Sequence, residues 1–128
     1  MNGATELGDS INHPTHYEQS HPGMECINLA DGLSFSLGNM VKYVWRYRSK
    51  GKLVEDLEKA AWYLDHASER GEQVALTLVQ RRMLERLGDT SDGYESGFWR
   101  ALLDGDLAAC RSALDGLIEL TGEEASRV

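Results

Sequence analysis

The stretch that decides the fold runs from residue 34 to residue 71 and reads SFSLGNMVKYVWRYRSKGKLVEDLEKAAWYLDHASERG. Its first part, residues 34–52, contains five Lys or Arg and no acidic residue, although the whole chain has a formal net charge of −8. Apolar residues recur at intervals of three and four in both parts, which predicts two amphipathic helices. Because only a short turn around residues 51–52 joins them, we expect an antiparallel pair that packs face to face.

The first helix of this pair is expected to begin at the N-cap Ser34 and to end at Gly51. Its apolar stripe, predicted to be buried, consists of Leu37, Met40, Val41, Val44 and Trp45. A second stripe consists of Asn39, Lys42, Tyr43 and Arg46, with Lys50 beyond it. Ammonium and guanidinium groups bind phosphate oxygens, and a phenol stacks on a base or bonds to a ribose or phosphate oxygen. The second stripe is therefore either an anion site or a solvated basic face.

The second helix is predicted over residues 54–70, with Gly71 as its C-terminal stop. Its buried residues are expected to be Val54, Leu57, Ala61 and Leu64, and a neighbouring face carries Asp56, Lys59 and Tyr63, with Trp62 and His66 nearby. Two interpretations stay open for this face. It forms a lattice of weak ion pairs with the first helix, or it closes a cleft in which Lys59 adds a third cation and Asp56 orients Arg46.

The remainder of the chain also has helical periodicity, and no alternating strand pattern is present. We predict a short helix over residues 24–30 and longer helices over residues 73–87, 94–103 and 106–120, with Gly88 ending the first of these longer helices. Residues 89–93 are expected to form a polar linker, and a frayed acidic tail follows residue 120. The expected fold is all-α, with a disordered lead over residues 1–10, a helical core with an N-terminal His loop over residues 11–71, which carries the candidate ligand site, and a C-terminal helical extension over residues 72–128.

Length and charge exclude several classes of protein. A chain of 128 residues forms one compact domain, and its pI of about 4.9 argues against binding of duplex nucleic acid, since the summed field repels polyphosphate. A small anion remains possible, because a pocket responds mainly to nearby charges. No apolar run approaches about 18 residues, so we expect no membrane partner and a cytoplasmic protein. Cys26 and Cys110 match no zinc or redox spacing, so we expect reduced and buried thiols.

A His-rich loop precedes the helices at residues 11–23, INHPTHYEQSHPG. Pro14 stiffens the backbone between His13 and His16. Three interpretations stay open: the two histidines are metal ligands that lack an evident third ligand, they bind phosphate or transfer a proton, or the loop covers a helix end as a structural plug.

Motifs that would identify a known enzyme are absent from the sequence. It contains no G-x-x-x-x-G-K-[ST], no G-x-G-x-x-G and no G-x-S-x-G. Glu55 and Glu58 provide one carboxylate pair, whereas a helical nucleotide pyrophosphatase needs two such pairs for magnesium. No residue is therefore assigned a catalytic role, and no metal site is predicted.

Three runs in the same order, NHPTHY, LSFSLGNMVKYVWRYRSKGK and EDLEKAAWYLD, resemble a family of small phage proteins. That family was first described as a domain of unknown function and later as nucleotide kinase-like. The resemblance covers about residues 11–70 and implies a phage origin, an all-helical core, a nucleotide ligand and, in a member of the family, phosphorylation of nucleoside monophosphates without a P-loop. The ligand contacts it implies are Asn12, His13, His16, Tyr17, Asn39, Lys42, Tyr43, Arg46, Lys50, Asp56, Lys59 and Trp62.

Three functions are therefore considered. The preferred one is a binding protein that sequesters a nucleotide or a nucleotide-derived signal of the infected bacterial host, which requires no cofactor. The alternative is a nucleotide kinase that uses ATP and Mg²⁺ to phosphorylate (deoxy)nucleoside monophosphates. The third is a structural helical protein. We also expect a homo-oligomer, in which Tyr94, Phe98 and Trp99 either contact another subunit or pack on their own core.

Overall fold

The computed structural model describes residues 23–49 and 51–126, and within these residues every regular element is a helix and none is a strand, as predicted. The predictions on residues 1–22 and on Lys50 lie outside the described residues. The helices are α3 (Cys26–Ala30), α4 (Phe35–Arg46), α5 (Leu53–Glu69), α6 (Leu78–Thr90), α7 (Gly93–Leu103) and α8 (Leu107–Ser126). None of the described helices is long and apolar enough to cross a membrane.

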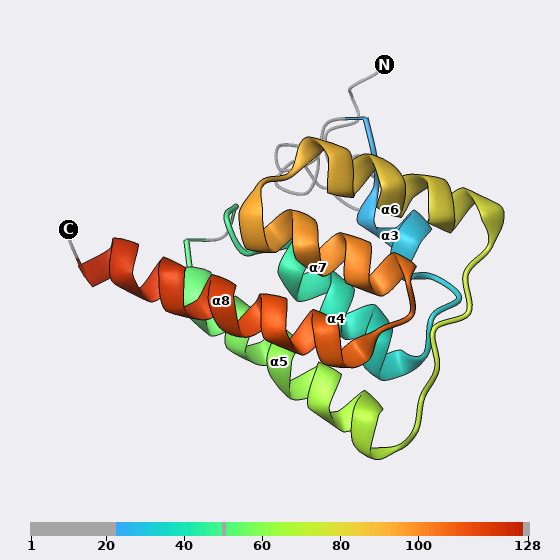
Figure 1. Ribbon diagram of the computed structural model, residues 1–128, viewed down its shortest axis with the longest axis horizontal. Helices are drawn as coiled ribbons and strands as arrows, with labels where there is room; N and C mark the ends of the chain where they lie inside the picture. Colours follow the sequence, from blue (N-terminus) through green and yellow to red (C-terminus); the bar gives the residue numbers. More distant parts are fainter. Residues whose placement is uncertain (1–22, 50, 127–128) are drawn as a thin grey trace, which may run out of the picture.

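The helices form two layers (Figure 1). In one layer α3 packs on α4 and α4 packs on α5, while in the other α6 packs on α7 and α7 packs on α8. The layers meet at their edges, where α5 contacts α8 and α3 contacts α6. The antiparallel pair α4–α5 and the C-terminal hairpin α7–α8 are therefore both present, and a long extended connection from α5 to α6 joins the layers.

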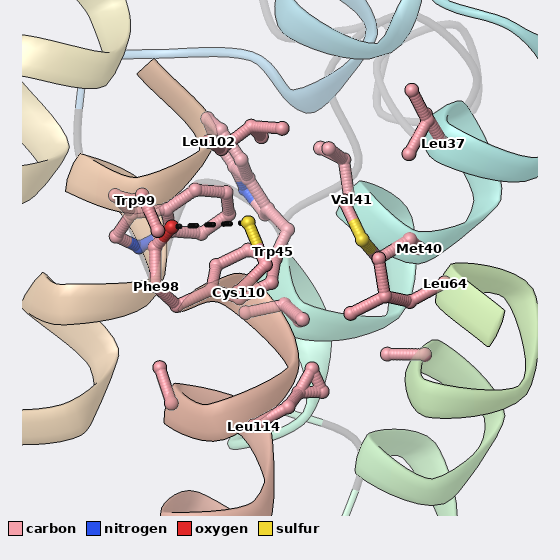
Figure 2. Packing of buried hydrophobic residues seen from close by; sticks show 14 of the residues in the cluster. Leu37, Met40, Val41, Trp45, Leu64, Phe98, Trp99, Leu102, Cys110 and Leu114 are labelled. Carbon is pink, nitrogen blue, oxygen red and sulfur yellow. Dashed lines mark hydrogen bonds between the residues drawn. The ribbon is translucent and has the colours of Figure 1, made fainter. Parts of the chain in front are cut away.

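A large hydrophobic core fills the space between the layers (Figure 2), and a smaller cluster of Tyr47, Leu57 and Leu117 is separate from it. The predicted apolar stripe of α4 is completely buried there, and the ring of Trp45 meets the ring of Trp99 from α7 edge to face, with centroids 6.2 Å apart. Phe98 is fully buried beside Trp99. Phe98 and Trp99 thus pack on the core of their own chain, whereas Tyr94 is half exposed. The two cysteines are free and buried, as predicted.

The end of α4 differs from the prediction. Ser34 caps the helix as expected, since its Oγ accepts a hydrogen bond from the Leu37 amide at 3.2 Å, but the helix ends at Arg46 and not at Gly51. Residues 47–49 form a turn in which Tyr47 is buried and donates a hydrogen bond to Glu95 of α7 at 2.9 Å. On α5, Val54 is half-buried and not buried as predicted.

The bounds of α6 and α8 were also predicted incorrectly. Thr77 and Gln80 form a capping box. The backbone N–H of Gln80 donates to Thr77 Oγ1 at 3.1 Å, and the backbone N–H of Thr77 donates to the side-chain Oε1 of Gln80 at 2.8 Å. This cap starts α6 at Leu78 and not at residue 73. Gly88 lies inside α6, where an added Cβ would come within 3.0 Å of Arg100 on α7. Helix α8 continues to Ser126 through the tail that was expected to fray.

Candidate functional site

Three cations surround one aromatic ring on the face shared by α4 and α5. The centroid of the Tyr43 ring lies 4.7 Å from Lys42 Nζ, 4.7 Å from Arg46 Cζ and 5.5 Å from Lys59 Nζ. An aromatic face carries partial negative charge and so attracts cations. Lys42, Arg46 and Lys59, here called the cation cluster, come from two helices that only tertiary packing brings together.

The carboxylate of Asp56 forms an ion pair with one member of the cation cluster, Arg46. Its Oδ2 lies 3.4 Å from Arg46 Nε, and its side chain is only 2% exposed. Asp56 occupies the first turn of α5, where the helix dipole also favours a negative charge. This pairing between α4 and α5 was predicted from the antiparallel arrangement, and it fixes the guanidinium of Arg46 beside the ring of Tyr43.

The cation cluster retains an excess of positive charge. Lys59 forms a weak ion pair with Glu55 at 3.9 Å, in which each side chain is 48% exposed. Among the described residues, the carboxylates of Asp56 and Glu55 contribute −2 against +3 from the three cations, which leaves +1. One ion pair, Arg46–Asp56, joins the two helices, and Lys59 is a third cation near the Tyr43 ring. The cleft that this face was predicted to close stays a prediction.

Three further aromatic rings extend the site from the ring of Tyr43. The four rings, here called the aromatic shelf, are those of Phe35, Tyr43, Trp62 and Tyr63. The rings of Tyr43 and Tyr63 are stacked, with centroids 6.0 Å apart and planes 11° apart, and Trp62 and Phe35 meet Tyr63 edge to face. Phe35 is 76% exposed and Trp62 is 61% exposed, so both present ring surface to solvent. The sequence reasoning did not select Phe35, although its position four residues before Asn39 places it on the same helical stripe.

A cavity of about 370 Å³, here called the α3–α4 pocket, opens beside the cation cluster. It is lined by Cys26, Ile27, Ala30, Asp31, Gly32, Leu33, Ser34, Phe35, Gly38, Asn39 and Lys42. The side-chain amide of Asn39 is held by a hydrogen bond from Nδ2 to the Phe35 carbonyl at 2.9 Å. Lys42 belongs both to this lining and to the cation cluster.

The thiol of Cys26 is a neutral part of the pocket lining. Burial raises the pKa of Cys26 to about 12, against the smaller lowering effect of the positive charges on Lys42 and Arg46. The thiol therefore stays protonated at neutral pH and is not an activated nucleophile. Its role in the lining is that of a small apolar group.

The predicted ligand contacts that the structure describes lie together. Asn39, Lys42, Tyr43, Arg46, Asp56 and Lys59 form one continuous region of the α4–α5 face. Trp62 joins this region through Tyr63 and also stacks on His66, with ring centroids 5.3 Å apart. Asn12, His13, His16, Tyr17 and Lys50 lie outside the described residues, so their predicted roles stay predictions.

Part of the chain is similar to a known protein family, but no activity is known for that family. Residues 11–65 match the model of DUF3310, a protein family of unknown function. No curated protein and no solved structure matches the chain. The matched segment includes α3, α4 and most of α5, which carry the cation cluster and line the α3–α4 pocket, and it ends before α6.

Proposed function

We propose that this chain is a phage protein that binds a nucleotide or a nucleotide-derived signalling molecule and sequesters it. The phosphate lies at the cation cluster, and the nucleoside part occupies the α3–α4 pocket or stacks on the aromatic shelf. One observation carries this proposal above the others: Lys42 lines the pocket and also faces the Tyr43 ring with Arg46 and Lys59. A ligand that fills the pocket therefore has its anionic end next to three cations.

The charges of the site support a phosphate-bearing ligand. Arg46 offers a planar fork of donors to phosphate oxygens, and Lys42 and Lys59 add point charges. Asp56 and the Tyr43 ring hold Arg46 in place before any ligand binds. A side chain that is already ordered loses little conformational entropy on binding, which increases affinity.

The shape and lining of the pocket support an organic group attached to that phosphate. Its volume of about 370 Å³ is within the usual range for small-molecule sites, about 300 to 1,000 Å³. Ile27, Ala30, Leu33 and Phe35 provide apolar surface, and Asn39 provides a fixed amide at the side. A base, with two apolar faces and a polar edge, matches this combination of groups.

Sequestration is preferred to catalysis because the groups found at the site are typical of binding. The central carboxylate, Asp56, is buried and paired with Arg46, and the Cys26 thiol is protonated. The resemblance of residues 11–70 to small phage proteins adds a reason to hold a nucleotide, since a phage benefits from removing an alarm signal of its host. A nucleotide kinase that uses ATP and Mg²⁺ is the alternative.

The test is to incubate the full chain with nucleoside monophosphates, cyclic nucleotides, and monophosphates together with ATP and Mg²⁺. Free ligand is removed, the protein is denatured, and the released compounds are separated by chromatography. We expect stoichiometric recovery of one intact nucleotide. Conversion of a monophosphate to a diphosphate would overturn sequestration in favour of the kinase, and the absence of any bound nucleotide would overturn both.

A variant of Lys42 tests whether the site lies where we propose. Lys42→Met should weaken nucleotide binding by about tenfold to a hundredfold, because a charged hydrogen bond is lost, while the helical circular dichroism stays unchanged. Lys52→Met is the matched control, since it removes the same charge from the same basic segment at an exposed position outside the cluster. Equal losses in the two variants would indicate a general charge effect and contradict the proposed site.

A further inference from the structure

Gln80 is a buried polar residue of α6 that contacts the other layer of the molecule. Its side chain is only 4% exposed, and its Nε2 donates hydrogen bonds to the carbonyls of Leu29 at 2.9 Å and Asp31 at 2.8 Å. Its Oε1 accepts the hydrogen bond from the Thr77 amide that closes the capping box. One side chain thus has two separate tasks, with its donor group facing α3 and its acceptor group facing its own helix.

Of the two residues whose carbonyls accept from Gln80, Asp31 lines the α3–α4 pocket, and Leu29 lies between the lining residues Ile27 and Ala30. Leu29 lies in the last turn of α3 and Asp31 is its C-cap, where carbonyl groups lack partners within the helix. Residues 30–35 continue from there as pocket lining and lead into α4. Gly32, in the middle of this loop, has φ +90°, and a Cβ added there would lie 3.7 Å from Gln80 Nε2. The amide of Gln80 is therefore directly behind the pocket wall.

We propose that Gln80 is a positioning residue for the ligand site and that it fixes the wall against which the nucleoside part of the ligand lies. This inference rests on the proposed function. Gln80 comes from the C-terminal extension, which lies beyond the family match over residues 11–65. The extension thus shapes the nucleoside end of the site, whereas the three cations of the phosphate end come from α4 and α5.

A purely structural role for Gln80 makes a different prediction. Loss of fold stability would weaken every ligand in proportion, whereas loss of the pocket wall should weaken a nucleotide and spare a ligand that is only phosphate. Pyrophosphate is therefore the reference probe, since it has the anionic groups of a nucleotide and no nucleoside part. The two tasks of the side chain are also separable by substitution. Gln80→Glu keeps an acceptor for the Thr77 amide and loses both donors to the wall.

The experiment measures the affinity of the full chain for the four ribonucleoside monophosphates and for pyrophosphate by titration calorimetry, at a temperature where every variant is folded. We expect Gln80→Met and Gln80→Glu each to weaken the tightest-binding monophosphate by about tenfold and to change pyrophosphate affinity less than about twofold. Thr77→Ala is the matched control. It breaks the other half of the capping box, lowers the melting temperature, and should leave both affinities within about twofold.

The possible failures are distinguishable. If the chromatographic test above finds that a cyclic nucleotide is the ligand, that nucleotide replaces the monophosphates in these titrations. If the unmodified chain binds no monophosphate, no cyclic nucleotide and no pyrophosphate, the proposed function and the role of Gln80 are both overturned. If the unmodified chain binds a monophosphate and the Gln80 variants bind it equally well, only the role of Gln80 is overturned. Parallel losses of monophosphate and pyrophosphate binding would also overturn it, because they would mean that Gln80 acts through stability alone.

Discussion

Two tyrosines four residues apart, Tyr43 and Tyr47, form clusters of the same residue types that differ in their balance of charge. Each ring has an arginine over it, Arg46 at 4.7 Å from the Tyr43 centroid and Arg48 at 5.0 Å from the Tyr47 centroid. Each arginine also has a carboxylate within 3.6 Å. Residue types alone therefore do not distinguish the two places.

The cluster at Tyr47 is balanced. Its hydroxyl donates a hydrogen bond to Glu95 at 2.9 Å, and Arg48 pairs with the same carboxylate at 3.6 Å, so one cation faces one anion. Tyr47 is buried, and its contacts join the turn after α4 to α7. Within the part of the chain that the structure describes, the cluster at Tyr43 has three cations against two carboxylates. Both clusters lie beside a cavity, since Lys42 lines the α3–α4 pocket and Arg48 lines another cavity of about 530 Å³. The difference between the two clusters is therefore the charge: an excess of cations favours an anionic ligand, whereas one cation paired with one carboxylate favours a structural contact.

Replacing the two arginines should give the largest difference in stability between the two clusters. Arg46→Met should lower the free energy of unfolding by about 3 kcal/mol, because it leaves the buried Asp56 carboxylate without this guanidinium. Arg48→Met should lower it by less than about 1 kcal/mol, since Arg48 is 63% exposed and Tyr47 still donates to Glu95. Urea denaturation measures both values, and equal losses would contradict the distinction.

A double variant sharpens the same test. Arg46→Met combined with Asp56→Leu should recover most of the lost stability, because a buried ion pair can often be replaced by apolar side chains at little cost. Nucleotide binding should be lost in Arg46→Met and also in the double variant, since the guanidinium itself is needed for the phosphate, and titration calorimetry measures both.

Removing the tyrosine hydroxyls should have a smaller effect on stability, and only at the cluster of Tyr47. Tyr47→Phe should lower the free energy of unfolding by about 1 kcal/mol, because the hydrogen bond to the nearly buried Glu95 is lost. Tyr43→Phe should change stability by less than about 0.3 kcal/mol and keep the ring that the cations face. A large loss of stability in Tyr43→Phe would show that its hydroxyl has a structural role.

The pH dependence of stability should detect Cys26 beside the cation cluster. Burial raises the pKa of Cys26 to about 12 in the folded protein, whereas an unfolded thiol titrates near about 8.5. The folded state therefore holds this proton more tightly, so the stability it contributes is fully present below about pH 8.5 and decreases as the pH rises towards 12.

From pH 8 to pH 9.5 the contribution of Cys26 should fall by about 1 kcal/mol, and Cys26→Ala should remove that part of the slope. Cys110, whose pKa burial raises in the same way, supplies the control, because its contribution stays in the Cys26→Ala variant. Urea denaturation at a series of pH values measures the slope. An unchanged slope in Cys26→Ala would mean that the thiol titrates normally in the folded protein.

The smallest expected effect is at the edge of the cation cluster. Glu55→Gln should change stability by less than about 0.5 kcal/mol, because its ion pair with Lys59 is half exposed. Pyrophosphate should bind about twofold more tightly, since Lys59 loses a competing carboxylate. Titration calorimetry measures this change, and weaker binding would mean that Lys59 does not face the ligand.

Much of the fold was predictable because it depends on local spacing. The apolar stripe of α4, the Ser34 cap and the antiparallel pair α4–α5 follow from residues within one or two helical turns of each other. The predicted end of α4 was wrong because Tyr47 is held by Glu95, which lies 48 positions away in the chain. The predicted start of α6 was wrong although the capping box of Thr77 and Gln80 is visible in the sequence.

The candidate site was predictable to a similar extent. The stripe of Asn39, Lys42, Tyr43 and Arg46 follows from helical period, and the contact between Arg46 and Asp56 follows from the packing of neighbouring helices. The α3–α4 pocket was not predictable, because its lining comes from a short helix, a loop and the exposed ring of Phe35.

The sequence by itself determined an all-helical chain in which a basic, aromatic stripe stands out against an acidic background, because period and charge can be read residue by residue. Only the tertiary structure decided which arginine is balanced by a carboxylate and which belongs to an excess of cations. It also brought Gln80 of α6 behind the wall of the pocket. The physical reason is that charge balance and pocket shape depend on distances in space between helices, and separation along the chain does not specify those distances.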